Sequence, residues 1–295
     1  MQQQEANFLK DVFADIIHHN VTADTKTWLQ EALRTKVSLQ QPDGEKNGAQ
    51  LNFAFAAVPR KTGRQLIQVT REEHDRLKEI HPPFSIKDWT IDRLCRVWIL
   101  LQLDSSDKEN YFRKLENLFK AAEMNELAAL YSALIGFDYP DDWQKQCAEG
   151  IRSNVGIVLE AIMYDNPYPY KYLSEPAWNQ LVMKAFFTDK DVRRIIGLDE
   201  RANKELAAIL VDYANERWAA HRIVNPQLWR LVSKFIEAGN FSNIEKVFNS
   251  SEVLEKKAAA LACFYSDYFP AKQLLENEPE LKSAILENKL NWNVL

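Results

Sequence analysis

Apolar residues recur at intervals of three and four along most of this 295-residue chain. This spacing places apolar side chains on one face of an α-helix. The segments between successive faces are short, which favours antiparallel neighbours in a bundle or a stacked solenoid. We therefore predict an all-α protein, an irregular HEAT-like helical array (an α-α superhelix) without a strict internal repeat. The clearest apolar faces comprise Phe8, Leu9, Val12, Phe13, Ile16 and Ile17, and further along Ile91, Leu94, Val97, Trp98 and Leu101.

The helical pattern changes between about residues 39 and 66. Gly44, Gly48 and Gly63 fall here, residues 40–50 are polar, and residues 51–55 alternate between apolar and polar at period two. We expect a short extended or loop insert in this range. Elsewhere no Pro-, Ser- or Gly-rich stretch is long enough to divide the chain, so we predict a single domain over residues 1–295.

The charge balance argues against a nucleic-acid-binding protein. Lys and Arg total 37 and Asp and Glu total 42, a formal net charge of −5, so no overall basic field attracts a polyanion. The start of the chain lacks the basic and apolar regions of a secretory signal, and no apolar run approaches the roughly 20 residues that span a bilayer. We expect a cytoplasmic protein, at most peripheral to a membrane, with Cys95, Cys147 and Cys263 as buried reduced thiols.

Several catalytic and cofactor signatures are missing. The chain contains no Gly-rich dinucleotide loop, no P-loop, no zinc-protease helix motif and no nucleophile elbow. The five histidines fit capping or surface positions better than a metal site. The sequence therefore predicts neither a metal nor a cofactor, and we favour a protein that is not an enzyme.

Residues 149–232 form the distinctive part of the sequence. Residues 1–148 are less distinctive, and only two short stretches in them, near residues 58–63 and 89–93, add weakly to the pattern. The series resembles the EboA-domain family of bacterial proteins. The likeness rests on several blocks in order: Glu149-Gly150-Ile151-Arg152-Ser153-Asn154, Asp165-Asn166-Pro167-Tyr168-Pro169, Ala177-Trp178-Asn179, Asp212-Tyr213-Ala214-Asn215-Glu216-Arg217-Trp218 and Asn225-Pro226-Gln227-Leu228-Trp229-Arg230.

The resemblance implies a pathway and no particular chemistry. Members of that family are encoded in the ebo gene cluster, beside proteins that resemble a UbiA-type prenyltransferase, a TatD-like hydrolase, a dehydroquinate synthase and a sugar-phosphate isomerase. The cluster is associated with making or moving a secondary metabolite towards the periplasm. The expected partners are therefore other proteins of an ebo-like pathway and possibly a small metabolite, and no catalytic residue is carried over.

Glu160 lies within an apolar helical run, where a buried carboxylate needs a partner or a raised pKa. Arg217 lies near the apolar face of a later predicted helix. We predict a structural ion pair between Glu160 and Arg217, or a similar pair that uses Glu216 or Arg230. The alternative is a carboxylate that faces a pocket as a general acid or base.

The same segment contains a candidate cleft. Two prolines predict a rigid loop over residues 165–170, and Asp199 precedes a helix start. Tryptophans on apolar helix faces pack the core or line a groove, and nearby basic side chains suit a phosphate or carboxylate, as in a prenyl-phosphate-like ligand. The candidate ligand-binding residues are Asp165, Asn166, Tyr168, Trp178, Asn179, Asp199, Arg217, His221 and Arg230.

Three functions fit these patterns. We favour a non-enzymatic interaction or accessory protein of a secondary-metabolite biosynthesis or export pathway. The first alternative is an enzyme that acts on a pathway intermediate in the cleft around Asp165, Asn166, Asp199, Arg217 and His221. The second is a protein that binds or carries a prenyl- or phosphate-containing metabolite.

Overall fold

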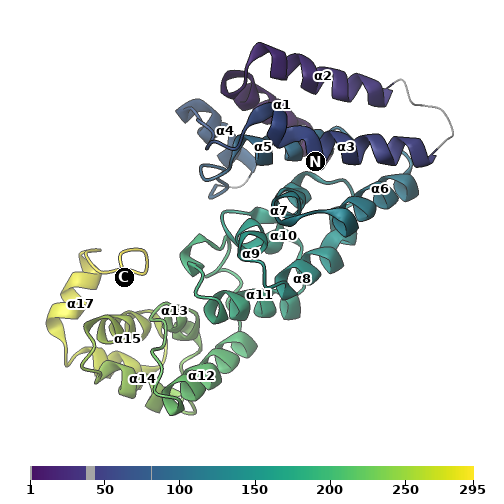
Figure 1. The fold of residues 1–295 in the computed structure, drawn as a ribbon. Coiled ribbons are helices and arrows are strands. Elements are labelled where there is room, and N and C mark those ends of the chain that lie inside the picture. Colours follow the sequence, from purple (N-terminus) through teal and green to yellow (C-terminus); the bar gives the residue numbers. More distant parts are fainter. Residues whose placement is uncertain (1, 38–43, 81) are drawn as a thin grey trace. The chain divides into compact units, whose positions relative to one another are not determined.

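A computed structural model describes residues 2–37, 44–80 and 82–295, and the chain is all-α over these ranges (Figure 1). No β-strand forms in the described residues, where an isolated antiparallel bridge joins Leu66 to Thr90. The all-α prediction is confirmed, whereas a HEAT-like superhelix stays a prediction. The contacts divide the chain into two compact units, Met1–Leu181 and Val182–Leu295. Compact units of one chain can fold together or apart, so the single domain also stays a prediction.

Over its described residues, the first unit is built from ten helices and part of an eleventh, with 3₁₀ turns between them. In chain order these are α1 (Gln2–Asn20), α2 (Ala23–Val37), α3 (Gly44–Thr62), α4 (Arg71–Ile80), α5 (Ile91–Leu101), α6 (Lys108–Ala121), α7 (Met124–Ala133), η1 (Leu134–Gly136), η2 (Pro140–Trp143), α8 (Gln144–Arg152), α9 (Gly156–Met163), α10 (Pro167–Tyr172) and α11 (Glu175–Phe187), which continues into the second unit.

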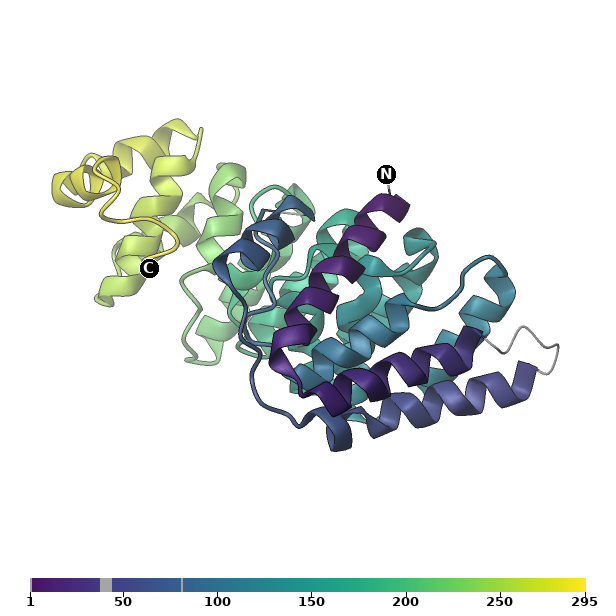
Figure 2. The same cartoon turned by 90° about the horizontal axis from the view of Figure 1, so that it is seen from above.

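Helix α5 forms the centre of the first unit. It packs against α1, α3 and α7, and α7 packs in turn against α9. The apolar residues of α5 are buried on nearly all sides, because neighbouring helices cover more than one of its faces. Helices α2 and α3 lie side by side in both views (Figures 1 and 2). The apolar stripe predicted over residues 91–101 is therefore the core of this unit.

The extended or loop insert expected near residues 39–66 is wrong over residues 44–62, which form helix α3. Leu51, Phe55 and Val58 are buried at helical spacing, whereas Phe53, the middle of the alternating run, is 76% exposed. A run of five residues fits both periods, and tertiary burial selects the helical one. Gly63 ends the helix with φ +78, and residues 38–43 lie outside the described residues.

The second unit is built around helix α15 (Val253–Tyr265). Residues 258–263 of α15 are fully buried, because small alanine side chains let other helices approach closely. Helix α15 packs against α13, α14, α16 and α17. The remaining elements are η3 (Val192–Arg194), α12 (Lys204–Ala219), α13 (Leu228–Val232), η4 (Ser233–Phe235), α14 (Phe241–Phe248), α16 (Phe269–Leu275) and α17 (Pro279–Leu286).

Local signals in the sequence account for several helix ends. Thr70 and Glu73 form a capping box: the Thr70 amide donates to the Glu73 carboxylate at 2.8 Å, and the Glu73 amide donates to the Thr70 hydroxyl at 3.3 Å. The Asn203 side chain caps α12 by accepting from the Leu206 amide at 2.8 Å. Within the described residues, no helix combines the length and the apolar character that crossing a bilayer requires.

The three cysteines are buried and free, as expected. Burial raises the pKa of the Cys263 thiol to about 12, and it raises the pKa of Cys95 and Cys147 as well. These thiols therefore stay protonated in the folded protein at a pH where an unfolded thiol, with a pKa of about 8.5, has lost its proton.

Alkaline pH is expected to destabilise the fold through Cys263. Between pH 8 and pH 10 the unfolded thiol releases its proton and the folded thiol keeps it, so the free energy of unfolding falls by about 2 kcal/mol for this group. Urea unfolding of the wild type and of Cys263→Ala at both pH values measures this contribution. We expect the variant to lose about 2 kcal/mol less than the wild type over this range. An equal loss in both proteins would contradict the prediction.

Candidate functional site

The candidate cleft residues fall into both units. Those of the first unit are Asp165, Asn166, Tyr168, Trp178 and Asn179, and those of the second are Asp199, Arg217, His221 and Arg230. The predicted pair of Glu160 with Arg217 joins residues of different units and stays a prediction, as does a cleft that combines the two groups.

The rigid loop expected over residues 165–170 is wrong from Pro167 onwards, where helix α10 begins. Pro167 and Pro169 occupy the first turn of this helix, where the missing amide hydrogens have no intrahelical partner to lose. Asp165 turns the chain with φ +53, and the Asn166 side chain caps the helix by accepting from the Tyr168 amide at 2.9 Å.

Asn166 and Tyr168 use their polar groups within the fold. The Asn166 amide nitrogen donates to the Ala161 carbonyl at 2.9 Å, and the Tyr168 hydroxyl donates to the Pro140 carbonyl at 2.6 Å. Both side chains are buried, as are Trp178 and Asn179 on α11. These bonds hold α10 against the end of α9 and the start of η2, which is a structural role.

Gly150, in the first block of the distinctive segment, also has a structural role. It lies on α8, where an added Cβ would stand 2.5 Å from the ring of Tyr131 and 2.6 Å from Cδ1 of Ile162. The Tyr131 ring is held in place, because its hydroxyl accepts from the Gln146 side chain at 3.1 Å. Glycine therefore lets α7, α8 and α9 meet closely at this point.

Gly150→Ala is expected to lower the free energy of unfolding by about 1–3 kcal/mol, since the new methyl group overpacks a rigid contact. Gly239→Ala is the matched control, because nothing lies within 4 Å of a Cβ added there. Thermal and urea unfolding of both variants tests the difference. A Gly150→Ala protein as stable as Gly239→Ala would show that the contact can relax.

In the second unit, Asp199 and Arg230 form a two-pronged ion pair. Arg230 Nε donates to Asp199 Oδ1 at 2.6 Å, and Arg230 Nη2 donates to Oδ2 at 2.5 Å. Arg217 instead holds a loop, since its Nε and Nη2 donate to the Ile223 carbonyl at 2.9 and 2.7 Å. Three of the predicted site residues thus bind groups of their own unit.

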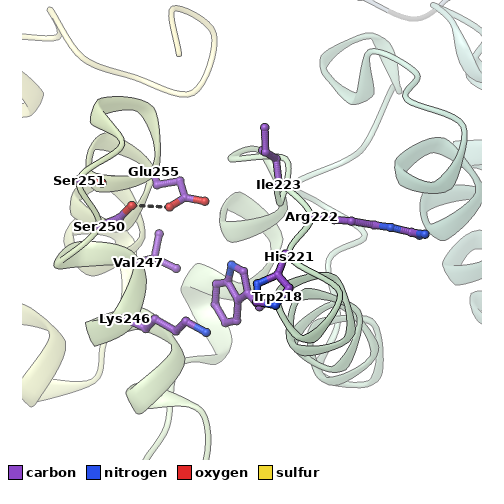
Figure 3. A pocket seen from close by; sticks show the side chains of 9 residues that line it. All are labelled: Trp218, His221, Arg222, Ile223, Lys246, Val247, Ser250, Ser251 and Glu255. Carbon is purple, nitrogen blue, oxygen red and sulfur yellow. Dashed lines mark hydrogen bonds between the residues drawn. The ribbon is translucent and has the colours of Figure 1, made fainter.

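His221 lines a pocket of about 550 Å³ within the second unit (Figure 3). One wall comes from the end of α12 and the turn that follows it, and comprises Trp218, His221, Arg222 and Ile223. The facing wall comes from α14, the next turn and the start of α15, and comprises Lys246, Val247, Ser250, Ser251 and Glu255. The left-handed backbone of His221, with φ +53, turns the chain at the end of the first wall.

Trp218 is the centre of the pocket wall. Its ring stacks on that of the buried Trp229, with centroids 5.8 Å apart and planes at 20°, and the Lys246 ammonium lies 3.9 Å from its centroid. This last distance is typical of a cation–π contact. Across the pocket, the Ser250 hydroxyl donates to Glu255 Oε2 at 2.5 Å (Figure 3). The pocket therefore combines an aromatic face, a cation above it and an acid held by a hydroxyl.

The basic side chains outnumber the acidic ones around this pocket. His221, Arg222 and Lys246 have no carboxylate partner among the described residues. The Arg222 side chain points away from the pocket, whereas His221 and Lys246 flank the Trp218 ring (Figure 3). In the part of the chain that the structure describes, no three His, Cys, Asp or Glu side chains gather as a metal site requires.

Sequence reasoning named one residue of the first wall, His221, and missed the facing wall altogether. Lys246 is an exposed lysine on a surface helix, and such residues carry no signal of a site on their own. Only the packing of α14 and α15 places it over Trp218.

Comparison with known proteins places the chain in a family. A family model described as metabolite traffic protein EboA matches residues 9–233. No curated protein and no solved structure matches the chain. The matched segment extends well upstream of residues 149–232, and it includes the Trp218 wall of the pocket but ends before the Lys246 wall.

Proposed function

The chain belongs to the EboA family, a family of metabolite traffic proteins, and we propose that it acts in this traffic as a non-enzymatic accessory protein that holds a metabolite. The observation that carries the proposal is the pocket around Trp218. Its volume of about 550 Å³ lies within the range of small-molecule sites, which combine apolar or aromatic walls with a few polar groups. A component that binds a metabolite without converting it fits a role in traffic.

The geometry favours binding over catalysis. A general acid or base needs a side chain free to reach the reacting proton of a substrate. Of the residues in the enzyme hypothesis, Asn166 is bonded to backbone groups, Asp199 is held by Arg230, and Arg217 is held by the Ile223 carbonyl. His221 faces the pocket, but no described side chain orients its ring as the partners of a catalytic histidine do.

We also propose that other proteins of an ebo-like pathway deliver or receive the metabolite in the cytoplasm, with at most peripheral contact to the membrane. A HEAT-like stacking of the helices would offer long surfaces for such partners. The net charge of −5 supports partners other than nucleic acid.

Native mass spectrometry of the protein purified from its own cells tests the metabolite. We expect a bound small molecule on the wild type that is lost from Trp218→Ala. Trp28→Ala is the matched control, since Trp28 is also a partly exposed helical tryptophan but belongs to the first unit and does not line the pocket. A wild-type protein without any bound molecule, or equal loss from both variants, would overturn metabolite binding at this site.

Affinity capture from the same cells tests the accessory role separately. Proteins of the pathway should be retained at near-stoichiometric amounts by the wild-type chain. If none is retained while a metabolite is bound, the protein is a carrier that works without stable partners, and the accessory role is wrong.

A further inference from the structure

We infer that the pocket takes an anionic metabolite with a flat aromatic or conjugated group, and that Lys246 binds its acid group. The inference rests on the proposed function, because it names the ligand class of the same pocket. The ligand's acid group is a carboxylate or a phosphate, both of which pair with an ammonium group.

Lys246 provides the charge. Several lysines of the second unit form ion pairs with a carboxylate. Lys204 pairs with Glu237, and Lys256 pairs with Glu278. Lys246 instead lies over Trp218, and no carboxylate of the described residues pairs with it. A cation–π contact at an exposed site is weak, so an incoming anion can draw the ammonium away from the ring at little cost.

Trp218 provides the flat surface. When Lys246 turns towards the acid group of a ligand, the face of the indole that it covers becomes free for the ligand's ring. The contact with Trp229 keeps the indole in place, so the surface exists before the ligand arrives. Stacking on a fixed aromatic ring avoids the entropy cost of ordering a loose one.

Glu255 sets the orientation of the ligand. Its carboxylate lies on the far side of Val247 from Lys246, held by the Ser250 hydroxyl (Figure 3). A second negative charge near Glu255 would be repelled, whereas Lys246 and His221 flank the ring of Trp218 at the opposite end. The acid group of the ligand therefore lies at the Lys246 end, and its uncharged part extends towards Val247.

The two walls contribute different properties. The aromatic face belongs to the segment matched by the family model, and the charge that selects an anion comes from residues after it. Lys246 is therefore the residue whose change should weaken the binding of anions, whereas flat neutral molecules should still stack on the Trp218 ring that it uncovers.

Isothermal titration calorimetry at low salt with 2-naphthoate and 2-naphthamide tests this inference, because the probes share a shape and differ in charge. We expect 2-naphthoate to bind more tightly than the amide, and Lys246→Gln to weaken the acid by at least about tenfold without weakening the amide, since it removes a hydrogen bond to a charged group. Lys246→Arg should keep most of the affinity. Lys234→Gln, at an exposed lysine without a described carboxylate partner that does not line the pocket, is the control and should have no effect.

The outcomes separate the inference from the proposed function. If both probes bound with equal affinity and Trp218→Ala abolished this binding, the pocket would remain a binding site, but the inference that it selects an anionic ligand would be wrong. Failure of both probes to bind, on a protein that carries a metabolite from its own cells, would overturn the ligand class alone. Failure to bind either probe on a protein that also carries no metabolite would overturn both.

Discussion

Arg96→Met is expected to lower the free energy of unfolding by about 3–5 kcal/mol, because it leaves a buried carboxylate without its partner. The Arg96 side chain is 3% exposed, and its Nη1 donates to Asp92 Oδ2 at 2.8 Å. Its Nε also donates to the Phe55 carbonyl at 3.1 Å, which ties α5 to α3. Burial lowers the pKa of Arg96, and the charges of Asp92 and Glu126 counteract this effect. Methionine keeps much of the volume and removes the charge.

Two further variants show whether the cost comes from the stranded charge. Asp92→Leu combined with Arg96→Met removes the buried pair and leaves Glu126, the second carboxylate beside Arg96, which is 14% exposed and can reach water. This variant should recover most of the lost stability, since an apolar pair can replace a buried ion pair at little cost. Arg76→Met breaks the exposed pair with Asp15 and should change stability by less than about 1 kcal/mol. Chemical unfolding of the three variants measures their free energies of unfolding. If Arg96→Met lost no more stability than Arg76→Met, the prediction of a costly stranded charge would be wrong.

The helices that sequence reasoning placed well are those with long apolar faces. Over residues 91–101, burial of Leu94 and Val97 follows the predicted stripe because eleven residues distinguish the helical period from the alternating one. Residues 51–55 were too few for this distinction. The apparent alternation of Leu51, Phe53 and Phe55 concealed a helix whose buried face continues to Val58.

The prolines of residues 165–170 show a second limit. Proline interrupts a helix in its interior but is favoured in the first turn, so the same residues predict either a break or a start. The deciding signal was present in Asn166, whose side chain can cap a helix that begins at the next residue. The cap, and not the prolines alone, indicates which reading is correct.

The candidate site was predictable only on the wall that is continuous in sequence. Trp218 and His221 lie three residues apart, so the end of one helix brings them together. Lys246 and Glu255 lie on α14 and α15, and the packing of these helices in the second unit places them opposite Trp218. Nothing local to Lys246 distinguishes it from other exposed lysines, because its role depends on a long-range contact.

Trp143→Ala is expected to lower the free energy of unfolding by about 3–5 kcal/mol, the usual cost of removing a large buried aromatic side chain. Trp143 is 2% exposed, stacks on Phe112 with ring centroids 4.4 Å apart, and donates from Nε1 to the Asp138 carbonyl at 3.1 Å. The loss of these contacts leaves a cavity between α6 and η2. Differential scanning calorimetry measures the cost.

The same substitution at Trp218 should cost only about 1–2 kcal/mol, because this side chain is partly exposed and contacts the open pocket on one side. The contrast separates a tryptophan that stabilises the fold from one that is kept for a ligand. If Trp218→Ala proved as destabilising as Trp143→Ala, loss of a bound metabolite in that variant would follow from loss of structure. A small cost in stability together with a large loss of binding is the result that only a ligand-binding surface produces.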